Sequence, residues 1–364
     1  MFYLNKFLEL NSSKVKLMDV NFELMDIGAK GGIPKEFYEL LPYNSEIICF
    51  EPNIEEFEKL AKEKNFHKKK FLNYAIALSN NRRKFYLTNY SSACSLYKMK
   101  DSFKRFHDSK NLRVISEIIV DCVSLDYLLE KKEIKVPNFI KIDVEGAELE
   151  ILEGSEKILS DINCLGIKVE IRFDKFLENS DNIENPLFSD VDNYLRKFGF
   201  KLYDLKTSTA GKFPLNQPYS LYDGKNMVPG PSIYGQIIGG DALYFKDPMA
   251  DENKLILDDE KNILRMIKLF SVHNQIDSAI ELASFLKNNN DDYSEILNYF
   301  KLDFYGKKID YQISQEFINK HNMNNDLLYW SKKEYFYKFS NYLFNYVKLL
   351  FPSKIKNIVR KKLL

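Results

Sequence analysis

The chain is poor in several features that mark whole classes of protein. Its four cysteines are scattered and form no C-x-x-C pair, which argues against a zinc site or a redox dithiol. The formal net charge is only +1, so we expect no attraction of the whole protein to nucleic acid. Neither the roughly 18 uninterrupted apolar residues of a membrane-spanning helix nor the apolar region of a signal peptide is found, because Asn5, Lys6 and Glu9 interrupt the N-terminus. These absences favour a cytoplasmic protein.

Apolar runs alternate with helical patterns over the first two thirds of the chain. At 364 residues and 45% hydrophobic content, the chain can bury a large core, with room for one full domain and a smaller one. We expect strands at 22–27, 46–50, 70–74, 139–143 and 164–171, and helices at about 34–41, 53–64, 124–131 and 147–159. Alternation of this kind predicts a doubly wound α/β sheet.

Further elements are expected around this alternation. They are an extra strand pair at Lys84–Thr88 and Ser116–Val123, a helix at Asp190–Phe198, and closing antiparallel strands at Phe200–Leu205 and Ala242–Lys246. The insert from Thr207 to Ser232 is rich in Pro, Gly, Asn and Tyr, which is too polar for core. We expect a long loop there, of the kind that is usually functional or mobile.

A glycine-rich turn follows the first expected strand. The strand F-E-L-M-D-I-G contains Asp26 near its end, and the turn Gly28-Ala29-Lys30-Gly31-Gly32 leads to Pro34, which suits a first helical position. Glycines let backbone N–H groups approach a ligand closely, and the helix N-terminus adds partial positive charge. A bland alternative is that Asp26 only caps the next helix.

The second strand, E-I-I-C-F, ends at Glu51, where a carboxylate can accept both hydroxyls of a ribose. The alternative is that Glu51 is a surface residue before Pro52. The glycine turn lacks the G-x-G-x-x-G spacing that seats a pyrophosphate, so a nicotinamide dinucleotide is disfavoured. A nucleoside with a ribose, an amino-acid tail and a sulfonium suits the acidic residues better, and S-adenosylmethionine (SAM) meets that description.

The most informative segment reads N-F-I-K-I-D-V-E-G-A-E-L-E-I-L, from Asn138 to Leu152. A buried strand runs into two carboxylates, Asp143 and Glu145, then Gly146 and an acidic helix start. Side chains at the carboxyl ends of strands face the crevice in which open α/β sheets bind ligands. Glu148 is expected only to complement the helix dipole.

These motifs resemble the FkbM-type methyltransferase family. The likeness rests on D26-x-G-A-x-G-G, on F-E51-P-N and above all on I-K-I-D143-V-E145-G-A-E148, and it covers roughly residues 15 to 247. It implies a Rossmann-like sheet of the class I methyltransferase type with SAM as cofactor. It also implies O-methylation of a sugar in a glycan, glycolipid or glycosylated metabolite. With the resemblance, we expect the cofactor site to comprise Asp26, Gly28, Ala29, Gly31, Gly32, Glu51, Pro52, Ala75 and Asp143.

Methyl transfer from a sulfonium is an in-line displacement, and a sugar hydroxyl needs a base to remove its proton. Asp143 and Glu145 are the first candidates and Glu170 the third, although Glu170 could instead form an ion pair with Arg172 or Lys168. A divalent ion such as Mg²⁺ held by Asp143 and Glu170 is a minor alternative, and no metal site is otherwise expected.

The chain changes character after Pro248. Glycines become rare and helical patterns follow, which predicts three parts: a lead-in at 1–20, a methyltransferase domain at 21–247 and a helical extension at 248–364. Lys332–Leu364 holds nine Lys or Arg residues against the single Glu334, with apolar residues at helical spacing. Such a helix can lie on an anionic membrane or an acidic partner, or simply dock on the catalytic domain. A nicotinamide oxidoreductase and a non-catalytic membrane-surface protein remain the alternative functions, and the oligomeric state is open.

Overall fold

The computed structural model describes most of the first 289 residues. The described ranges are 20–30, 32–34, 37, 40, 45–62, 69–106, 109, 112–212, 220–222, 227–229, 235–289, 301–304 and 307–310. The chain divides into two compact units, Met1–Leu297 and Asn298–Leu364. In the second unit, the antiparallel hairpin of β15 (Lys301–Phe304) and β16 (Lys307–Asp310) is described. The basic segment Lys332–Leu364 lies outside the described residues.

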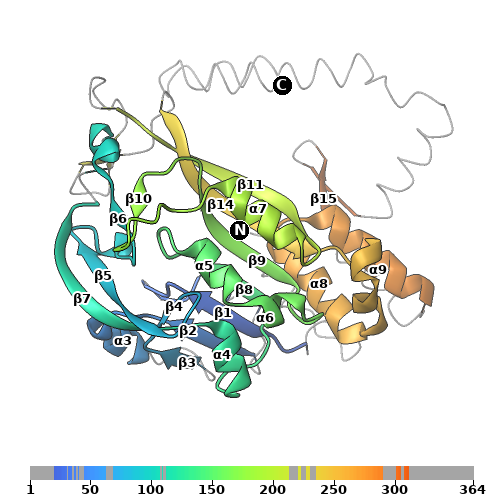
Figure 1. The fold of residues 1–364 in the computed structure, drawn as a ribbon. Coiled ribbons are helices and arrows are strands. Elements are labelled where there is room, and N and C mark those ends of the chain that lie inside the picture. The colour runs from blue at the N-terminus through green and yellow to red at the C-terminus, as the bar shows by residue number, and fades with distance from the viewer. Residues whose placement is uncertain are drawn as a thin grey trace, which may run out of the picture. The chain divides into compact units, whose positions relative to one another are not determined.

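A seven-stranded sheet forms the centre of the first unit (Figure 1). Its order is β11-β14-β9-β8-β1-β2-β3, with bounds Phe200–Ala210, Gln236–Lys246, Gly166–Arg172, Phe139–Ile142, Glu23–Ile27, Glu46–Phe50 and Lys69–Leu72. The five strands from β9 to β3 are parallel, while β14 runs antiparallel to β9 and β11 antiparallel to β14. This confirms the predicted Rossmann-like doubly wound sheet. The chain returns from β3 to β8 on the other side of β1, so the switch in winding direction lies between β1 and β8.

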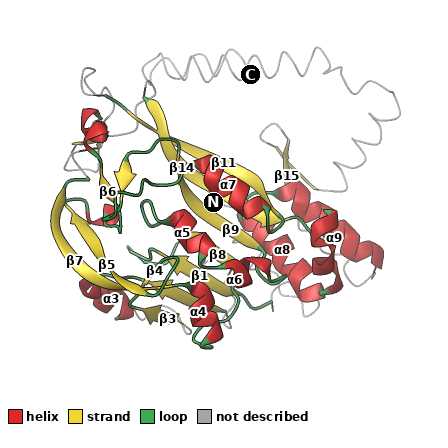
Figure 2. Cartoon of the chain, in the orientation of Figure 1, coloured by secondary structure: helices red, strands yellow, loops and turns green. Residues whose placement is uncertain are grey.

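The central parallel strands are buried because helices cover both faces of such a sheet. The core joins the strands to the helices that follow them, through residues such as Met25, Ile140, Val169, Ile151 and Leu195. The covering helices include α3 (Ile54–Ala61), α4 (Leu125–Glu130), α5 (Glu148–Glu153), α6 (Glu156–Ser160) and α7 (Phe188–Arg196) (Figure 2). Asn53 and Ser124 cap α3 and α4 with their side-chain oxygens, which fixes where these helices begin.

The single helix expected at 147–159 is wrong, because two short helices, α5 and α6, occupy that range. The break lies at Gly154, which packs against the backbone of the β4–β5 connection. A Cβ there would lie 2.7 Å from the carbonyl oxygen of Ala77, and the Gly154 carbonyl accepts a hydrogen bond from Asp126 N–H at 3.0 Å. A close tertiary contact at Gly154 therefore ends α5, although the helical pattern of the sequence continues beyond this residue.

A second sheet contains β4 (Ala75–Ile76), β7 (Val114–Val123) and β5 (Asn81–Thr88), and β5 runs antiparallel to β7 as predicted. Between β5 and β7 the short strand β6 (Lys98–Met99) pairs with β10 (Leu177–Glu178). Phe103 stacks on Phe106 and Phe176 at centroid distances of 4.7 and 4.3 Å. This aromatic group holds the 91–106 segment against the end of β9.

The closing strands are longer than expected, because β11 continues past Leu205 to Ala210 and β14 begins at Gln236 rather than Ala242. The polar run after Leu205 forms a strand whose residues pair with β14 rather than a loop. Gly240 makes the close pairing possible, since a Cβ there would lie 2.0 Å from the carbonyl oxygen of Lys206. Within the remaining insert, β12 (Ser220–Tyr222) pairs with β13 (Met227–Pro229).

Two longer helices follow the sheet: α8 (Glu260–Val272) and α9 (Ile276–Asn289). The α8 face is apolar and meets the sheet, with the Phe270 ring 4.9 Å from Phe245 and the His273 ring stacked 4.9 Å from Phe139. Arg265 Nε donates to the carbonyl of Asn21 at 2.9 Å. The helices directly after residue 248 are therefore part of the first unit. Among the described residues, no helix is both long and apolar enough to cross a bilayer.

Candidate active site

The carboxyl ends of β1, β2 and β8 meet at one edge of the sheet. The register pairs Ile27 with Phe50 on one side and with Ile142 on the other, so the residues that follow these strands are neighbours. A cavity lies at this edge, and five of the expected cofactor residues line it: Gly28, Glu51, Pro52, Ala75 and Asp143. Parallel pairing of β1, β2 and β8 brings Gly28, Glu51 and Asp143 together from distant parts of the sequence, whereas Ala75 comes from β4 of the second sheet.

Gly28 is where the turn after β1 passes closest to the end of β8. Its φ is +85°, and a Cβ would lie 1.9 Å from the carbonyl oxygen of Asp143. The N–H groups of Gly28 and Ala29 donate to the carbonyl of Phe50 at 3.3 and 3.1 Å, which ties the turn to β2. Ala29 is buried and, like Gly32, is not among the residues that line the cavity. Gly31 lies outside the described residues.

Asp26 is fully buried and, unlike Ile27 and Gly28, is not among the residues that line the cavity. Its Oδ1 is 3.3 Å from Lys141 Nζ, and the same ammonium is 3.2 Å from Asp143 Oδ2. Burial lowers the pKa of Lys141, but attraction to Asp26 and Asp143 outweighs it, so the pKa is raised and the lysine is a firm cation. Lys141 lies between two isoleucines in an apolar strand. A charged residue in a buried strand is unusual, and that pattern could have identified Lys141 as a site residue from the sequence.

Glu51 is 4% exposed, so it is not the surface residue that the alternative required. Burial raises the pKa of Glu51 to about 7, although a hydrogen bond that the carboxylate accepts from Asn53 N–H at 2.9 Å acts in the opposite direction. A buried carboxylate that accepts one hydrogen bond from its own chain can accept further hydrogen bonds from a ligand. Ribose hydroxyls are donors of the kind that such a group accepts.

The loop after β8 is shaped by two unusual backbone conformations. Glu145 has φ +60° and Gly146 has φ +122°. Glu148 is the first residue of α5, and both of its carboxylate oxygens accept the Gly146 N–H at 3.0 Å. Its side chain therefore bonds to the backbone just before its own helix. Ser95 Oγ lies 2.8 Å from the carbonyl oxygens of Val144 and Glu145. The loop is thus held by a segment 50 residues upstream.

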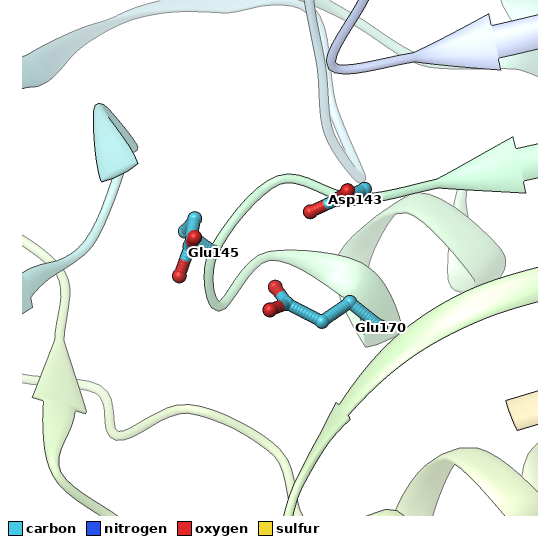
Figure 3. A group of neighbouring side chains, drawn as sticks. All are labelled: Asp143, Glu145 and Glu170. Carbon is cyan, nitrogen blue, oxygen red and sulfur yellow. The ribbon is translucent and has the colours of Figure 1, made fainter. Parts of the chain in front are cut away.

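Asp143, Glu145 and Glu170 form an acidic group next to the cavity, and Asp143 belongs to both (Figure 3). One carboxylate oxygen from each lies within 4.8 Å of the others. Arg172 contacts two of them: its Nη1 is 2.8 Å from Glu170 Oε1, and its Nη2 donates to Glu145 Oε2. Three carboxylates at this spacing offer ligand atoms to a cation, and the guanidinium already supplies positive charge to two of them.

Burial dominates the electrostatics of the group. It raises the pKa of Glu145 to about 7, while Arg172 lowers that pKa and the charge of Asp143 raises it. Burial raises the pKa of Glu170 well above its ordinary value, and Arg172 again acts in the opposite direction. More carboxylates than cations share the space, so a proton is retained in this group near neutral pH.

The structure adds site residues that the sequence did not indicate. Lys30, Cys94 and Leu96 line the cavity, and the ring of Tyr97 supports Gly146 from behind. Tyr97 Oη donates to Glu150 at 2.6 Å, and Glu150 also pairs with Arg83. The segment around residues 92–97 has neither periodicity nor a motif, so its place beside the loop after β8 comes only from tertiary packing.

Comparisons with known proteins agree on methyl transfer. A family model described as a methyltransferase FkbM domain matches residues 26–202. The hexuronic acid methyltransferase AglP of Haloferax volcanii is 36% identical over 55 residues, which are 15% of this chain. The match spans 23% of that relative, less than a quarter of its length.

Two solved structures that match this chain are described as methyltransferases. The precorrin-6y C5,15-methyltransferase of Geobacter metallireducens shares 12% identity, with 62% of this chain and 80% of that chain covered and a TM-score of 0.25. A SAM-dependent methyltransferase of Methanosarcina mazei shares 11% identity, with 62% and 93% covered and a TM-score of 0.26. Scores this low add nothing to what the sheet topology already shows.

Proposed function

Residues 26–202 belong to the FkbM methyltransferase family, and from that premise we propose that the cavity at the ends of β1, β2 and β8 binds SAM. Methyltransferase activity, the cofactor contacts and the acceptor are all parts of this proposal. The observation that carries it is the meeting of Gly28, Glu51 and Asp143 at the switch in winding direction. Ligands of open α/β sheets bind at such a point.

The residues present fit the parts of SAM. Glu51 would accept hydrogen bonds from the ribose hydroxyls, and the Gly28–Gly32 turn would allow backbone atoms to approach the cofactor. Asp26 forms an ion pair with Lys141, and Lys141 also pairs with Asp143 and so positions that carboxylate. When bound, SAM supplies an activated methyl group on a sulfonium. The surplus of carboxylates beside the cavity favours that positive charge.

The chain's own contribution to catalysis is alignment and removal of a proton. Alignment of the acceptor oxygen with the methyl carbon and sulfur can supply about 7–11 kcal/mol of the barrier. A base within reach of the acceptor hydroxyl adds about 10²–10⁴-fold. Asp143, Glu145 and Glu170 are the candidates, because their carboxylates lie close to one another and Asp143 also lines the cavity.

We propose that the acceptor is a hydroxyl of a sugar in a glycan, glycolipid or glycosylated metabolite. Two observations support this: the resemblance of the I-K-I-D-V-E-G-A-E segment to enzymes that O-methylate sugars, and the printed activity of the relative AglP on a hexuronic acid. A role in polysaccharide synthesis in the cytoplasm follows from the same proposal.

Calorimetric titration with SAM, and with NADH as the competing cofactor, tests the pocket. We expect SAM alone to bind, and Asp26→Ala or Glu51→Ala to abolish binding, with Glu55→Gln on the exposed start of α3 as the control. Tight binding of NADH instead of SAM would favour an oxidoreductase. Unchanged SAM affinity in both variants would show that the cofactor lies elsewhere.

Methyl transfer is measured with methyl-labelled SAM and a panel of methyl glycosides, including a glucuronide. We expect Asp143→Asn to bind SAM normally and to turn over more slowly, since Asp143 lies where the cavity and the acidic group meet. A normal rate in this variant would remove Asp143 from catalysis. Transfer to none of the sugars, with SAM bound, would refute the acceptor class but not the methyltransferase.

We also propose that the basic segment Lys332–Leu364 makes peripheral contact with anionic membranes, because it is rich in cations and its apolar residues recur at helical spacing. Co-sedimentation with vesicles containing phosphatidylserine compares the full chain with a chain shortened to end at Asn324. Binding by the full chain alone supports the contact. Equal sedimentation of both chains, or of neither, contradicts it.

A further inference from the structure

Lys30 is a cation in the cavity at the ends of β1, β2 and β8. It lies in the glycine turn after β1 and is partly buried. Among the described residues that line the cavity, Lys30 is the single cation, and it shares the cavity with two carboxylates, Glu51 and Asp143. Asp143 already pairs with Lys141, which is not part of the lining. Within the cavity, Lys30 is therefore the cation available to Glu51.

The backbone places Lys30 close to Glu51. The N–H groups of Gly28 and Ala29 both donate to the carbonyl of Phe50, at 3.3 and 3.1 Å. Lys30 directly follows Ala29, and Glu51 directly follows Phe50, so the two side chains start from neighbouring points of the cavity wall. Hydrogen bonds of the backbone therefore bring the two residues together, whatever conformation the lysine side chain takes.

The surroundings of Glu51 are mostly acidic, and Lys30 compensates for them. Burial raises the pKa of Glu51 to about 7, the charges of Asp26 and Glu56 act in the same direction, and the charge of Lys30 acts against them. The carboxylate accepts the Asn53 N–H at 2.9 Å, and within the described residues no ion pair to Glu51 is closed. Lys30 thus favours the ionised form of Glu51 without occupying its oxygens.

A ribose hydroxyl can use both side chains at once. A carboxylate only accepts hydrogen bonds and an ammonium only donates them, whereas a hydroxyl does both. A hydroxyl between the two would donate to Glu51 and accept from Lys30, and hydrogen bonds with a charged partner are the stronger kind. Glu51 alone would leave the hydroxyl oxygen without a donor from this pair.

We propose that Lys30 and Glu51 form the ribose site of the cavity together, with Glu51 accepting from the ribose hydroxyls and Lys30 donating to a hydroxyl oxygen. The inference rests on the proposed function, since it assumes that SAM occupies this cavity. Lys30 then contacts the cofactor and also keeps the neighbouring carboxylate ionised at neutral pH. The pair selects ligands that carry an intact ribose diol.

Other titratable groups near Glu51 enter its pH dependence. Besides its two acidic neighbours on β1 and α3, the cavity is lined by Tyr74 after β3, by Cys94 after β5 and by Asp143 after β8. These groups are the same in every Lys30 variant. A difference in pH profile between a Lys30 variant and wild type therefore reports the loss of the lysine charge.

Calorimetric titration with SAM at pH 7 and pH 9 tests the pair. We expect Lys30→Met to weaken binding at pH 7 by about ten- to a hundred-fold, the value of a hydrogen bond to a charged group. Without the ammonium the pKa of Glu51 rises, so the loss relative to wild type should be smaller at pH 9. Lys30→Arg keeps the charge and should lose less than Lys30→Met at both pH values. An equal loss at pH 7 and pH 9 would overturn the link to Glu51.

The control is Lys62→Met, because Lys62 is exposed and follows the last residue of α3. It should bind SAM like wild type at both pH values. A loss in this variant as large as that in Lys30→Met would show that the effect belongs to the net charge of the protein, and would contradict the proposal.

A double-mutant cycle tests whether Lys30 acts together with Glu51. In Glu51→Gln there is no carboxylate charge to stabilise, so adding Lys30→Met should cost less affinity than it costs in wild type. Losses that simply add would overturn the inference, since they would mean that Lys30 contacts the cofactor independently of Glu51.

Ligand variation locates the contact on the cofactor. 5′-Methylthioadenosine keeps the nucleoside of SAM but lacks the amino-acid tail, and Lys30→Met should weaken its binding by about the same factor. Its 2′,3′-dideoxy form should be affected much less. A loss with SAM alone would show that Lys30 binds the carboxylate of the tail instead. If wild type does not bind SAM, the proposed function fails; if wild type and Lys30→Met bind SAM equally well, this inference alone fails.

Discussion

At the residue scale, the site depends on carboxylates that are buried before any ligand arrives. Glu51 shows the consequence most simply, because burial raises its pKa to about 7 and one N–H donor does not offset that cost. Between its unfolded pKa of 4.5 and about 7, the folded protein binds a proton that the unfolded chain has released. The contribution of Glu51 to the free energy of unfolding therefore falls as the pH rises through that window. A ligand that donates to the carboxylate would recover part of the loss.

Glu51→Gln should separate binding from stability. The amide keeps the acceptor for Asn53 N–H but offers no charge, so SAM affinity should fall about ten- to a hundred-fold, the value of a hydrogen bond to a charged group. The wild-type affinity should weaken below pH 7 and that of the variant should not. Unfolding by urea at pH 5.5 and 8 should show the variant gaining relative stability at the higher pH. Glu55→Gln should match wild type in every measurement, and a wild-type affinity independent of pH would contradict this role of Glu51.

Gly28 makes a second prediction at this scale. Gly28→Ala combines a left-handed φ with a Cβ 1.9 Å from a backbone oxygen that cannot move freely, so stability should fall by more than the 1–2 kcal/mol typical of strain alone. SAM binding should be lost even in the folded fraction. Gly199→Ala is the matched control, with φ +81° and a side-chain neighbour, Asn253, far from the site. Retained SAM affinity in Gly28→Ala would show that the turn does not form part of the pocket.

At the element scale, strand ends could be predicted from the sequence and the connections between them could not. Apolar runs ending at Asp26, Glu51 and Asp143 mark parallel strands, and parallel pairing brings their ends together without further information. The segment that contains Ser95 and Tyr97 has no such pattern, since its position depends on side-chain contacts with the loop after β8. The same holds for the break at Gly154 and the continuation of β11 past Leu205, where neighbouring backbone decides the structure.

Ser95→Ala tests whether that unpredicted segment controls the loop after β8. Ser95 is 2% exposed and its hydroxyl contacts two loop carbonyls, so loss of the hydroxyl should cost about 1–2 kcal/mol in urea unfolding. Amide hydrogen exchange over residues 143–147 should quicken. In the control Ser160→Ala, an exposed hydroxyl that bonds within its own helix is removed, and the change should stay within about 0.5 kcal/mol. Equal exchange in both variants would mean that the loop is held without Ser95.

At the scale of the whole molecule, the sheet has an apolar face that α8 covers. Phe139 lies in the central strand β8 and Phe245 in β14, and both meet rings at the end of α8. Six buried apolar side chains of α8 face inward: Ile263, Leu264, Met266, Ile267, Leu269 and Phe270. A composition change after Pro248 predicts an extension from there, yet the contacts of α8 with β8 and β14 tie the next 25 residues to the catalytic sheet.

Two shortened chains distinguish a separate extension from an integral one. A chain that ends at Asp247 would expose Phe139 and Phe245, and burial of each such ring contributes about 1.5–3 kcal/mol, a large share of the 5–15 kcal/mol that holds a domain folded. We expect it to aggregate or to lack a cooperative thermal transition. A chain that ends at Leu297 keeps α8 and α9 and should unfold cooperatively and bind SAM like the full chain. If the chain ending at Asp247 folds and binds SAM equally well, α8 is an appendage, and the catalytic domain closes with β14 as the sequence alone predicts.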